Sequence, residues 1–385
     1  MIPYGRQDIT QADVDAVTDV LRSDFITQGP TIPRFEQAVT SRVGAAHGVA
    51  VNSATSALHV ACAALHLGPG DILWTVPNTF VASANCGRYC GADIDFVDID
   101  SFTWNLSVPA LKEKLVAARR DDRLPSVVVP VHFGGQPTDQ EEIWNLAQEY
   151  DFRVLEDASH SVGASRNGEP AGSCRWSDIA VFSFHPVKIV TTAEGGMALT
   201  NDAELAERMR MLRSHGITRN PARLQLAAAP PPAWYYEQHL LGFNYRMTDI
   251  HAALGLSQLA RLDGYVERRN ALARRYEESL ATLPLQLPGI RPGNHSAFHL
   301  YVIRLVEPRA GAHRRVFDEL RRHGIGVNLH YTPVHLQPYY RALGFREGMF
   351  PAAEAYGESA ISLPLFPIMT EQQQDTVVTV LRKAL

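Results

Sequence analysis

Lys188 is one of four lysines in the chain, and it stands where a charged side chain is hard to explain. It directly follows the apolar run "AVFSFHPV" and precedes the segment "TTAEGG". A lysine that is partly removed from water has a lowered pKa, so its neutral amine can act as a nucleophile or base. Alternatively, its stem packs on a strand end while the ammonium reaches water. Lys188 alone does not decide between these readings.

The segment "NSATSAL", residues 52–58, places small residues and hydroxyls where a strand gives way to a helix. Backbone N–H groups, the helix dipole and the Thr55 and Ser56 hydroxyls could bind a phosphate there. An ordinary helix N-cap has the same appearance, so both readings stay open.

Three further residues follow or end apolar runs. Asp157, in "EDASH", could hold a protonated ring nitrogen, or it could cap a helix. Phe80, in "PNTFVASAN", could cover a flat ring, or it could belong to the core. Ser183, in "FSFHPVK", could add a hydroxyl to the phosphate site.

Together these residues offer a phosphate cradle, an aromatic face, a carboxylate and an amine. This set matches pyridoxal 5'-phosphate, which carries a phosphate, a pyridine ring and an aldehyde. The combination is a stronger indication of this cofactor than any one of the motifs.

Short β-branched runs alternate with helical patterns between about residues 48 and 200, which predicts an α/β fold with a mostly parallel seven-stranded sheet. Open α/β sheets bind ligands at the carboxyl ends of their strands, so we expect the motifs to converge there. The expected strands are "GVAVNS", "DILWTV", "DIDFVDI", "SVVVPVHF", "RVLEDAS", "IAVFSF" and "GGMALT".

The sequence pattern after the predicted sheet indicates a second domain. We expect a large domain, residues 1–250, and a small C-terminal α+β domain, residues 251–385. The small domain is expected to begin within the long amphipathic helical stretch from Asp249, and to contain the strands "FHLYVIRL" and "IGVNLHY" and the helix "HRRVFDELRRHG". The Ala/Pro-rich segment 220–234 is expected to form a loop.

Acidic and basic residues are interspersed and the formal net charge is −5, which argues against binding to nucleic acid or to a membrane surface. The apolar windows are too short to span a bilayer, so we expect a cytoplasmic protein. The four cysteines lack paired metal-ligand spacing, and no metal site is expected.

These motifs resemble the DegT/DnrJ/EryC1/StrS sugar aminotransferases, a group of fold type I pyridoxal-phosphate enzymes. The resemblance covers nearly the whole chain, including "EDASHSVGA", "FSFHPVKIVTTAEGG", "GFNYRMTDIHAALGLSQL" and "HYTPVHLQPYY". It implies that Lys188 forms the Schiff base with the cofactor and that Asp157 pairs with the pyridine nitrogen.

The resemblance also implies the remaining contacts. His160 would lie near the cofactor ring and Phe80 would stack on it, while Asn244 of a neighbouring subunit would complete the phosphate site in a homodimer. The phosphate would otherwise be held by Ala54, Thr55, Ser56 and Ser183. The binding site for the nucleotide sugar would be lined by Tyr4, Asp24, Phe25, Ile26, Thr27, His330 and Tyr331.

Within the family, "NSATSAL", "FSFHPVK" and "RSHGITR" are similar to the branch that serves pseudaminic acid biosynthesis. That branch moves the amino group of L-glutamate to C4 of UDP-2-acetamido-2,6-dideoxy-β-L-arabino-hexos-4-ulose. An aminotransferase for a different nucleotide-linked keto sugar is the nearer alternative. A non-catalytic cofactor-binding regulator is the more distant one.

Overall fold

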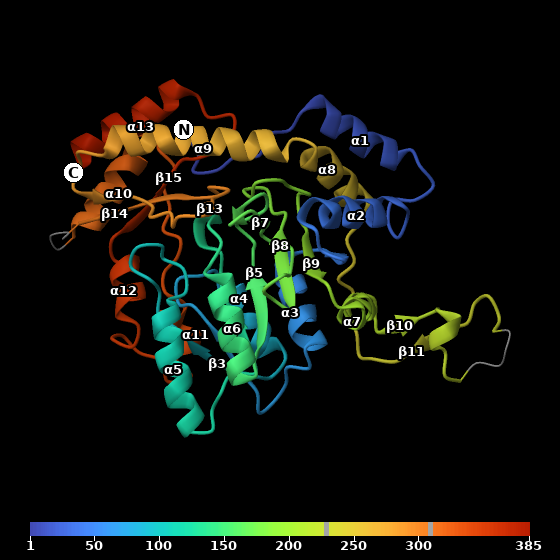
Figure 1. Cartoon of the computed structure of the whole chain (residues 1–385). Coiled ribbons are helices and arrows are strands. Elements are labelled where there is room, and N and C mark those ends of the chain that lie inside the picture. Colours follow the sequence, from blue (N-terminus) through green and yellow to red (C-terminus); the bar gives the residue numbers. More distant parts are fainter. Residues whose placement is uncertain (227–230, 307–310) are drawn as a thin grey trace.

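The computed structural model describes residues 1–226, 231–306 and 311–385, and its centre is a seven-stranded sheet (Figure 1). The strand order is β1-β9-β8-β5-β4-β2-β3. Their bounds are β1 His47–Val51, β2 Ile72–Thr75, β3 Asp93–Phe96, β4 Val127–Val129, β5 Arg153–Asp157, β8 Ile179–Ser183 and β9 Gly196–Thr200. All seven predicted runs contribute a strand, so the prediction of this sheet is confirmed.

Strand direction explains why the motifs can meet. β9 is antiparallel to both β1 and β8, and the remaining neighbours are paired in parallel. β1 therefore runs in the same direction as β8, and every strand except β9 has its carboxyl end at one edge of the sheet. β9 begins at this edge, so the segment "TTAEGG" lies there as well.

Side chains on the central strands alternate between two apolar clusters, as the period of a strand requires. Val181 belongs to the cluster that includes α3, whereas Ala180 and Phe182 belong to the cluster that includes α2. Both faces of the sheet are therefore covered by helices. The helices of residues 1–250 are α1 Gln11–Leu21, α2 Thr31–Val43, α3 Ala54–Ala64, α4 Ala82–Tyr89, α5 Val108–Arg120, α6 Gln140–Tyr150, α7 Ala203–Arg213 and the start of α8, Asp249–Leu259.

The long amphipathic helical stretch from Asp249 contains two helices, α8 and α9, Leu262–Leu280. α8 packs against α1 and α2, whereas α9 runs along the top of the molecule in Figure 1 towards the C-terminal elements. These are β12 Leu285–Gln286, β14 Tyr301–Leu305, α10 Ala312–Arg322, α11 Pro338–Arg341, α12 Pro351–Gly357, β15 Ala360–Leu363 and α13 Glu371–Ala384.

The prediction that "IGVNLHY" forms a strand is wrong. Ile325 forms an isolated bridge with Ile2, and Asn328 forms another with Ser362 of β15. Each of these two neighbouring segments pairs with only one residue of "IGVNLHY". The β-branched composition of the segment therefore does not produce a continuous strand. The antiparallel sheet in this region is formed by β12, β14 and β15.

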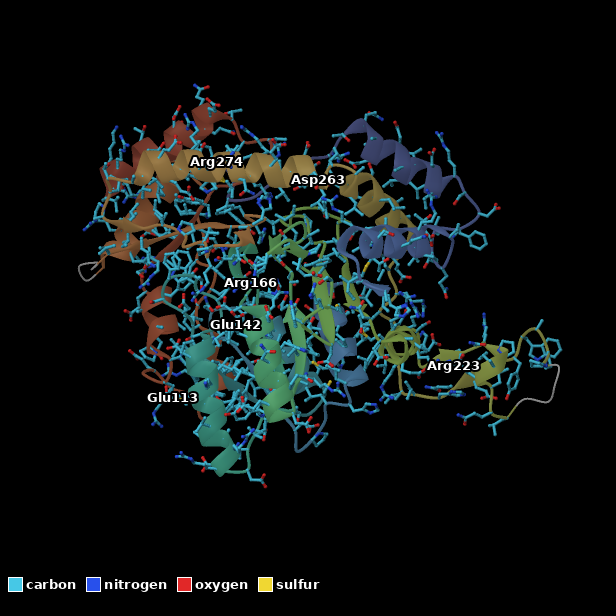
Figure 2. All side chains as sticks on the ribbon, viewed as in Figure 1. Glu113, Glu142, Arg166, Arg223, Asp263 and Arg274 are labelled. Atoms are coloured by element: carbon cyan, nitrogen blue, oxygen red, sulfur yellow. The ribbon has the colours of Figure 1, made fainter. Side chains whose placement is uncertain are left out.

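A second small sheet joins distant parts of the chain beside α6. It contains β6 Ser165–Arg166, β7 Glu169–Pro170 and β13 Asn294–His295. Arg166 forms ion pairs with Asp139 at 2.8 Å and Glu142 at 3.6 Å, and Figure 2 shows Arg166 beside Glu142. These pairs hold the small sheet against the start of α6.

The segment between α7 and α8 projects away from the body, to the right in Figure 1. It contains the paired strands β10 Ile217–Thr218 and β11 Glu237–Gln238, and we call residues 217–241 the arm. Arg223, labelled in Figure 2, pairs with Glu204 of α7 at 3.4 Å. The predicted loop 220–234 lies within the arm, and its residues 227–230 are outside the described part of the chain.

Three short 3-10 helices complete the described elements. They are Phe133–Gly135, Pro221–Arg223 and Val334–Leu336. The first follows β4 and the last follows the "HYTP" segment, so both lie close in sequence to the carboxyl-end motifs.

Candidate functional site

A cavity of about 470 Å³ opens at the carboxyl edge of the sheet. It is within the usual size range of small-molecule sites, about 300–1,000 Å³. Most of the predicted site residues line it: Tyr4, Ala54, Thr55, Phe80, Asp157, His160, Ser183, Lys188, His330 and Tyr331.

Other predicted site residues do not line this cavity. Ser56 is buried and its hydroxyl donates to Asn52 Oδ1 at 2.7 Å. Asn244 is exposed and bridges to Ser214, and residues 24–27 lie on the surface. Within one chain, the structure therefore does not bring these residues into contact with the cavity.

Lys188 is half-buried in the wall of the cavity, immediately beyond β8. Burial lowers the pKa of its amine to about 8, although the nearby Asp157 carboxylate opposes the shift. A considerable fraction of the amine is therefore neutral near physiological pH, and a neutral amine is the form that attacks an aldehyde or removes a proton.

This pKa makes a testable prediction for the cofactor-free protein. The rate at which Lys188 bonds covalently to added pyridoxal 5'-phosphate should rise with pH and level off above a midpoint near 8. An unperturbed lysine would have its midpoint at about 10.4. Stopped-flow absorbance measurements from pH 6 to 11 check this, and a rate that keeps rising above pH 10 would contradict it.

Asp157, at the end of β5, is 5% exposed and both of its carboxylate oxygens accept hydrogen bonds. The Ser83 hydroxyl donates to Oδ2 at 2.6 Å, and the Ser159 N–H donates to Oδ1 at 3.1 Å. Thr79 lies 2.7 Å from the Ser83 hydroxyl. Since the single Ser83 proton goes to the carboxylate, Thr79 donates to Ser83. This hydroxyl chain fixes the plane of the carboxylate.

Removing the hydroxyl at the centre of this chain should impair the reaction. A hydrogen bond to a charged group contributes about 1.5–3 kcal/mol, so Ser83→Ala should lower kcat by roughly 10-fold or more while KM for the amino donor changes much less. Ser83→Cys, with a weak thiol donor, should be intermediate. Steady-state kinetics check the split, and an unchanged kcat in Ser83→Ala would show that Asp157 does not need this donor.

The first turn of α3 presents backbone N–H groups to the cavity. Ser53 is the N-cap and accepts from the Ser56 N–H, while Ala54 and Thr55 line the cavity. A Cβ on Gly196 would lie 2.5 Å from the Ala54 nitrogen, so only glycine lets β9 approach the start of α3 this closely. Ser183 faces the same cavity from β8. The arrangement suits an anion at a helix N-terminus.

His160 connects the cavity wall to Tyr331. The Gly134 N–H donates to His160 Nδ1 at 3.3 Å, so the proton of the neutral ring is on Nε2, which lies 3.3 Å from the Tyr331 hydroxyl. Burial and the nearby Lys188 amine hold the pKa of His160 well below its usual value. Nε2–H therefore donates to Tyr331, whose own hydroxyl proton remains available for a ligand.

Phe80 differs from a core aromatic residue because 55% of its surface is exposed. Its ring lies 6.0 Å from the Tyr331 ring, at the cavity. Packing within one chain thus leaves much of the Phe80 ring able to contact a ligand.

Sequence reasoning did not identify several residues of the site. Thr79, Ser159, His299 and Asn328 line the cavity, and Ser83 supports Asp157 from behind. The serine in "TFVAS" lies one helical turn beyond Thr79, and this spacing was the available signal. His299 gave no local signal because it precedes a strand of the C-terminal part.

The fold and cavity define a class, the α/β enzymes that use pyridoxal 5'-phosphate at the carboxyl edge of a seven-stranded sheet. The chain belongs to the DegT/DnrJ/EryC1/StrS aminotransferase family, because the sequence pattern of that family matches residues 7–382. Family members are sugar aminotransferases that depend on pyridoxal 5'-phosphate, and this chain is such an enzyme.

Individual relatives and solved structures are similar to the chain over nearly its whole length. The spore coat polysaccharide biosynthesis protein SpsC of Bacillus subtilis is 38% identical, over 99% of this chain and 96% of its own. The structure of the sugar aminotransferase Spr1654 from Streptococcus pneumoniae, described as putative and in its PMP form, superposes with a TM-score of 0.91 at 29% identity, covering 100% of both chains. Helicobacter pylori PseC, an aminotransferase involved in the biosynthesis of pseudoaminic acid, gives a TM-score of 0.90 at 29% identity and covers 100% of this chain and 98% of its own.

The groups in the cavity fit the cofactor in kind. An amine of lowered pKa suits its aldehyde, a buried carboxylate suits its ring nitrogen, and a helix start with nearby hydroxyls suits its phosphate. Among the described residues, no helix is long and apolar enough to cross a membrane.

Proposed function

We propose that this sugar aminotransferase transfers the amino group of L-glutamate to C4 of a UDP-linked 4-keto-6-deoxy sugar, UDP-2-acetamido-2,6-dideoxy-β-L-arabino-hexos-4-ulose. The observation that carries the proposal is the placement of Lys188 and Asp157 in one cavity with the start of α3. Similarity to PseC over the whole chain supports the choice of sugar.

The proposal assigns roles to the residues around the cofactor. Ala54, Thr55 and Ser183 would hold the phosphate, and Ser56 supports the same turn through Asn52. Phe80 would cover one face of the ring. The remaining contacts are His160 at the ring and Asp157 at its nitrogen.

When bound, pyridoxal 5'-phosphate would supply an aldehyde carbon that can carry the amino group and an electron-withdrawing ring that stabilises the negative charge left when a proton is removed. Lys188 Nζ removes the proton from the α-carbon of L-glutamate, and in the second half of the reaction it delivers a proton to C4 of the sugar. Asp157 would keep a positive charge on the ring nitrogen through a buried ion pair. The Tyr331 hydroxyl, oriented by His160, donates into the cavity.

We also propose that the active enzyme is a homodimer in which Asn244 of each chain completes the phosphate site of the other. Asn244 is exposed, and the arm beside it carries Trp234, which is 80% exposed, and Leu241, which is 86% exposed. Large exposed apolar side chains are typical of protein interfaces. Residues 24–27 and Tyr4, together with His330 and Tyr331, are proposed to bind the nucleotide sugar.

The shared site predicts complementation between inactive chains. Asn244→Asp would place a carboxylate against the phosphate and Lys188→Ala removes the reactive amine, so each variant alone should be nearly inactive. Mixed dimers contain one complete site, and random reassociation should restore roughly a quarter of wild-type activity. No recovery in mixed dimers verified by native mass spectrometry would contradict a shared site.

The division into two domains near residue 250 remains a proposal. A separate C-terminal domain is supported by an apolar cluster around β14, β15, α10 and α13, whose buried members all lie from Leu272 onward, so the clusters divide within α9. The N-terminal half of α9 packs instead with α2 and the central strands. The expected cytoplasmic location also remains a prediction.

The substrate is tested by incubating the purified protein with L-glutamate and a panel of UDP- and dTDP-linked 4-keto sugars, followed by mass spectrometry. The proposal expects amination of the UDP-linked sugar named above in preference to the others. Preference for another nucleotide-linked keto sugar would support the alternative that the 38% identity to SpsC keeps open. A non-catalytic regulator would aminate none, but such a protein would not need Lys188.

A further inference from the structure

His299 lies in the cavity wall, two residues before β14, and the roles assigned above do not use it. Its side chain is 5% exposed, and its ring centroid lies 4.4 Å from that of His160. The buried Arg269 guanidinium donates to the carbonyls of Phe298 at 3.2 Å and His299 at 3.4 Å. The backbone that presents the imidazole is therefore held in place by α9.

The surroundings of the ring determine its tautomer. Nδ1 is enclosed and has no hydrogen-bond partner among the described residues. An enclosed N–H without an acceptor is costly, and a lone pair is the less costly group to leave unpaired. We therefore place the proton on Nε2. That nitrogen has no acceptor within the described parts of the chain, although the residue lines the cavity.

The imidazole is neutral. Burial holds the pKa of His299 well below its usual value, and the Lys188 amine and the Arg269 guanidinium add to the effect. Burial lowers the pKa of His160 and His330 in the same way. Of the described residues that line the cavity, none is an arginine, and Lys188 is the only lysine. This wall therefore presents neutral hydrogen-bond donors, which suit hydroxyl and carbonyl oxygens better than phosphate or carboxylate groups.

From this geometry we propose that His299 Nε2–H donates a hydrogen bond to an oxygen of the sugar ring of the acceptor substrate. His299 is thus a specificity-determining residue for the keto-sugar half of the reaction, whereas the amino donor does not use it. The inference rests on the proposed function. In this arrangement the sugar lies beside His160, His330 and Tyr331. The anionic diphosphate binds to residues outside this part of the cavity wall.

The two half-reactions can be measured separately by absorbance in single turnovers of the cofactor-loaded enzyme. For the keto-sugar half-reaction, the measured quantity is the single-turnover rate constant divided by the Kd of the UDP-4-keto sugar. His299→Leu should lower this ratio about 10- to 100-fold, because the variant lacks a buried donor that contacts a substrate oxygen. The L-glutamate half-reaction should change by less than about 2-fold. His299→Gln, whose side-chain amide can supply an N–H near Nε2, should recover most of the loss.

Binding provides a readout that is independent of turnover. Calorimetry should show weaker binding of the UDP-4-amino-4,6-dideoxy sugar product to His299→Leu, with binding of UDP alone unchanged. Equal losses in both half-reactions would overturn the inference, because they would assign His299 to the cofactor or to folding. No loss in either would overturn it as well. If wild-type protein fails to react with L-glutamate, the proposed function itself fails, and that outcome is distinct from a failure specific to His299.

Discussion

Lys188→Ala is expected to lower kcat for transamination by at least about 10³-fold, because it removes both the group that bonds to the cofactor and the base that moves the α-proton. The other lysines cannot substitute for it. Lys112 and Lys114 lie on α5, and Lys383 lies in α13. The measurement is kcat with saturating L-glutamate and keto sugar.

Lys112→Ala is the matched control, since it removes an exposed lysine and should leave kcat unchanged. Borohydride reduction of the cofactor-loaded wild type, followed by peptide mass mapping, should find the reduced adduct on Lys188. An adduct on another lysine, or full activity in Lys188→Ala, would contradict the assignment.

Asp157→Asn should have the second largest effect. The substitution preserves volume but removes the charge that keeps the ring nitrogen protonated, so kcat should fall by about 10²–10⁴-fold. The side-chain amide also cannot accept from both Ser83 and Ser159 as the carboxylate does. Cofactor binding should weaken less than kcat falls.

A cofactor analogue provides the control for this second prediction. Pyridoxal 5'-phosphate methylated at the ring nitrogen carries a permanent positive charge, so it should restore part of the activity of Asp157→Asn and none of that of Lys188→Ala. If the analogue restores nothing while the variant remains folded by circular dichroism, Asp157 acts through something other than the ring charge.

The fold was largely predictable because local patterns and tertiary structure agree in most of the chain. The central strands are short β-branched runs with helices such as α5 and α6 between them, as the alternation of patterns predicts. The exception is "IGVNLHY", where Ile2 and Ser362 each pair with one residue. Such pairings depend on segments that are distant in the sequence, which periodicity does not report.

The candidate site was predictable where its residues directly follow strands, because parallel strands bring their carboxyl ends together. Lys188, Asp157 and Thr55 line one cavity for this reason. Ser83 and His299 were missed because their significance depends on contacts across the structure: one donates to a carboxylate from α4, and the other reaches the cavity from the C-terminal part. For Ser83 the only local signal was its spacing from Thr79, and no sequence pattern around His299 indicates its contact with the cavity.

The central claim, that Lys188 and its cavity catalyse transamination from L-glutamate to a keto sugar, is tested most directly by following the bound cofactor spectroscopically. L-glutamate should convert the cofactor to its aminated form with stoichiometric release of 2-oxoglutarate. Adding UDP-2-acetamido-2,6-dideoxy-β-L-arabino-hexos-4-ulose should then restore the original spectrum and yield the UDP-4-amino sugar by mass spectrometry. A cofactor that remains bound to Lys188 and is unchanged by L-glutamate would contradict the account.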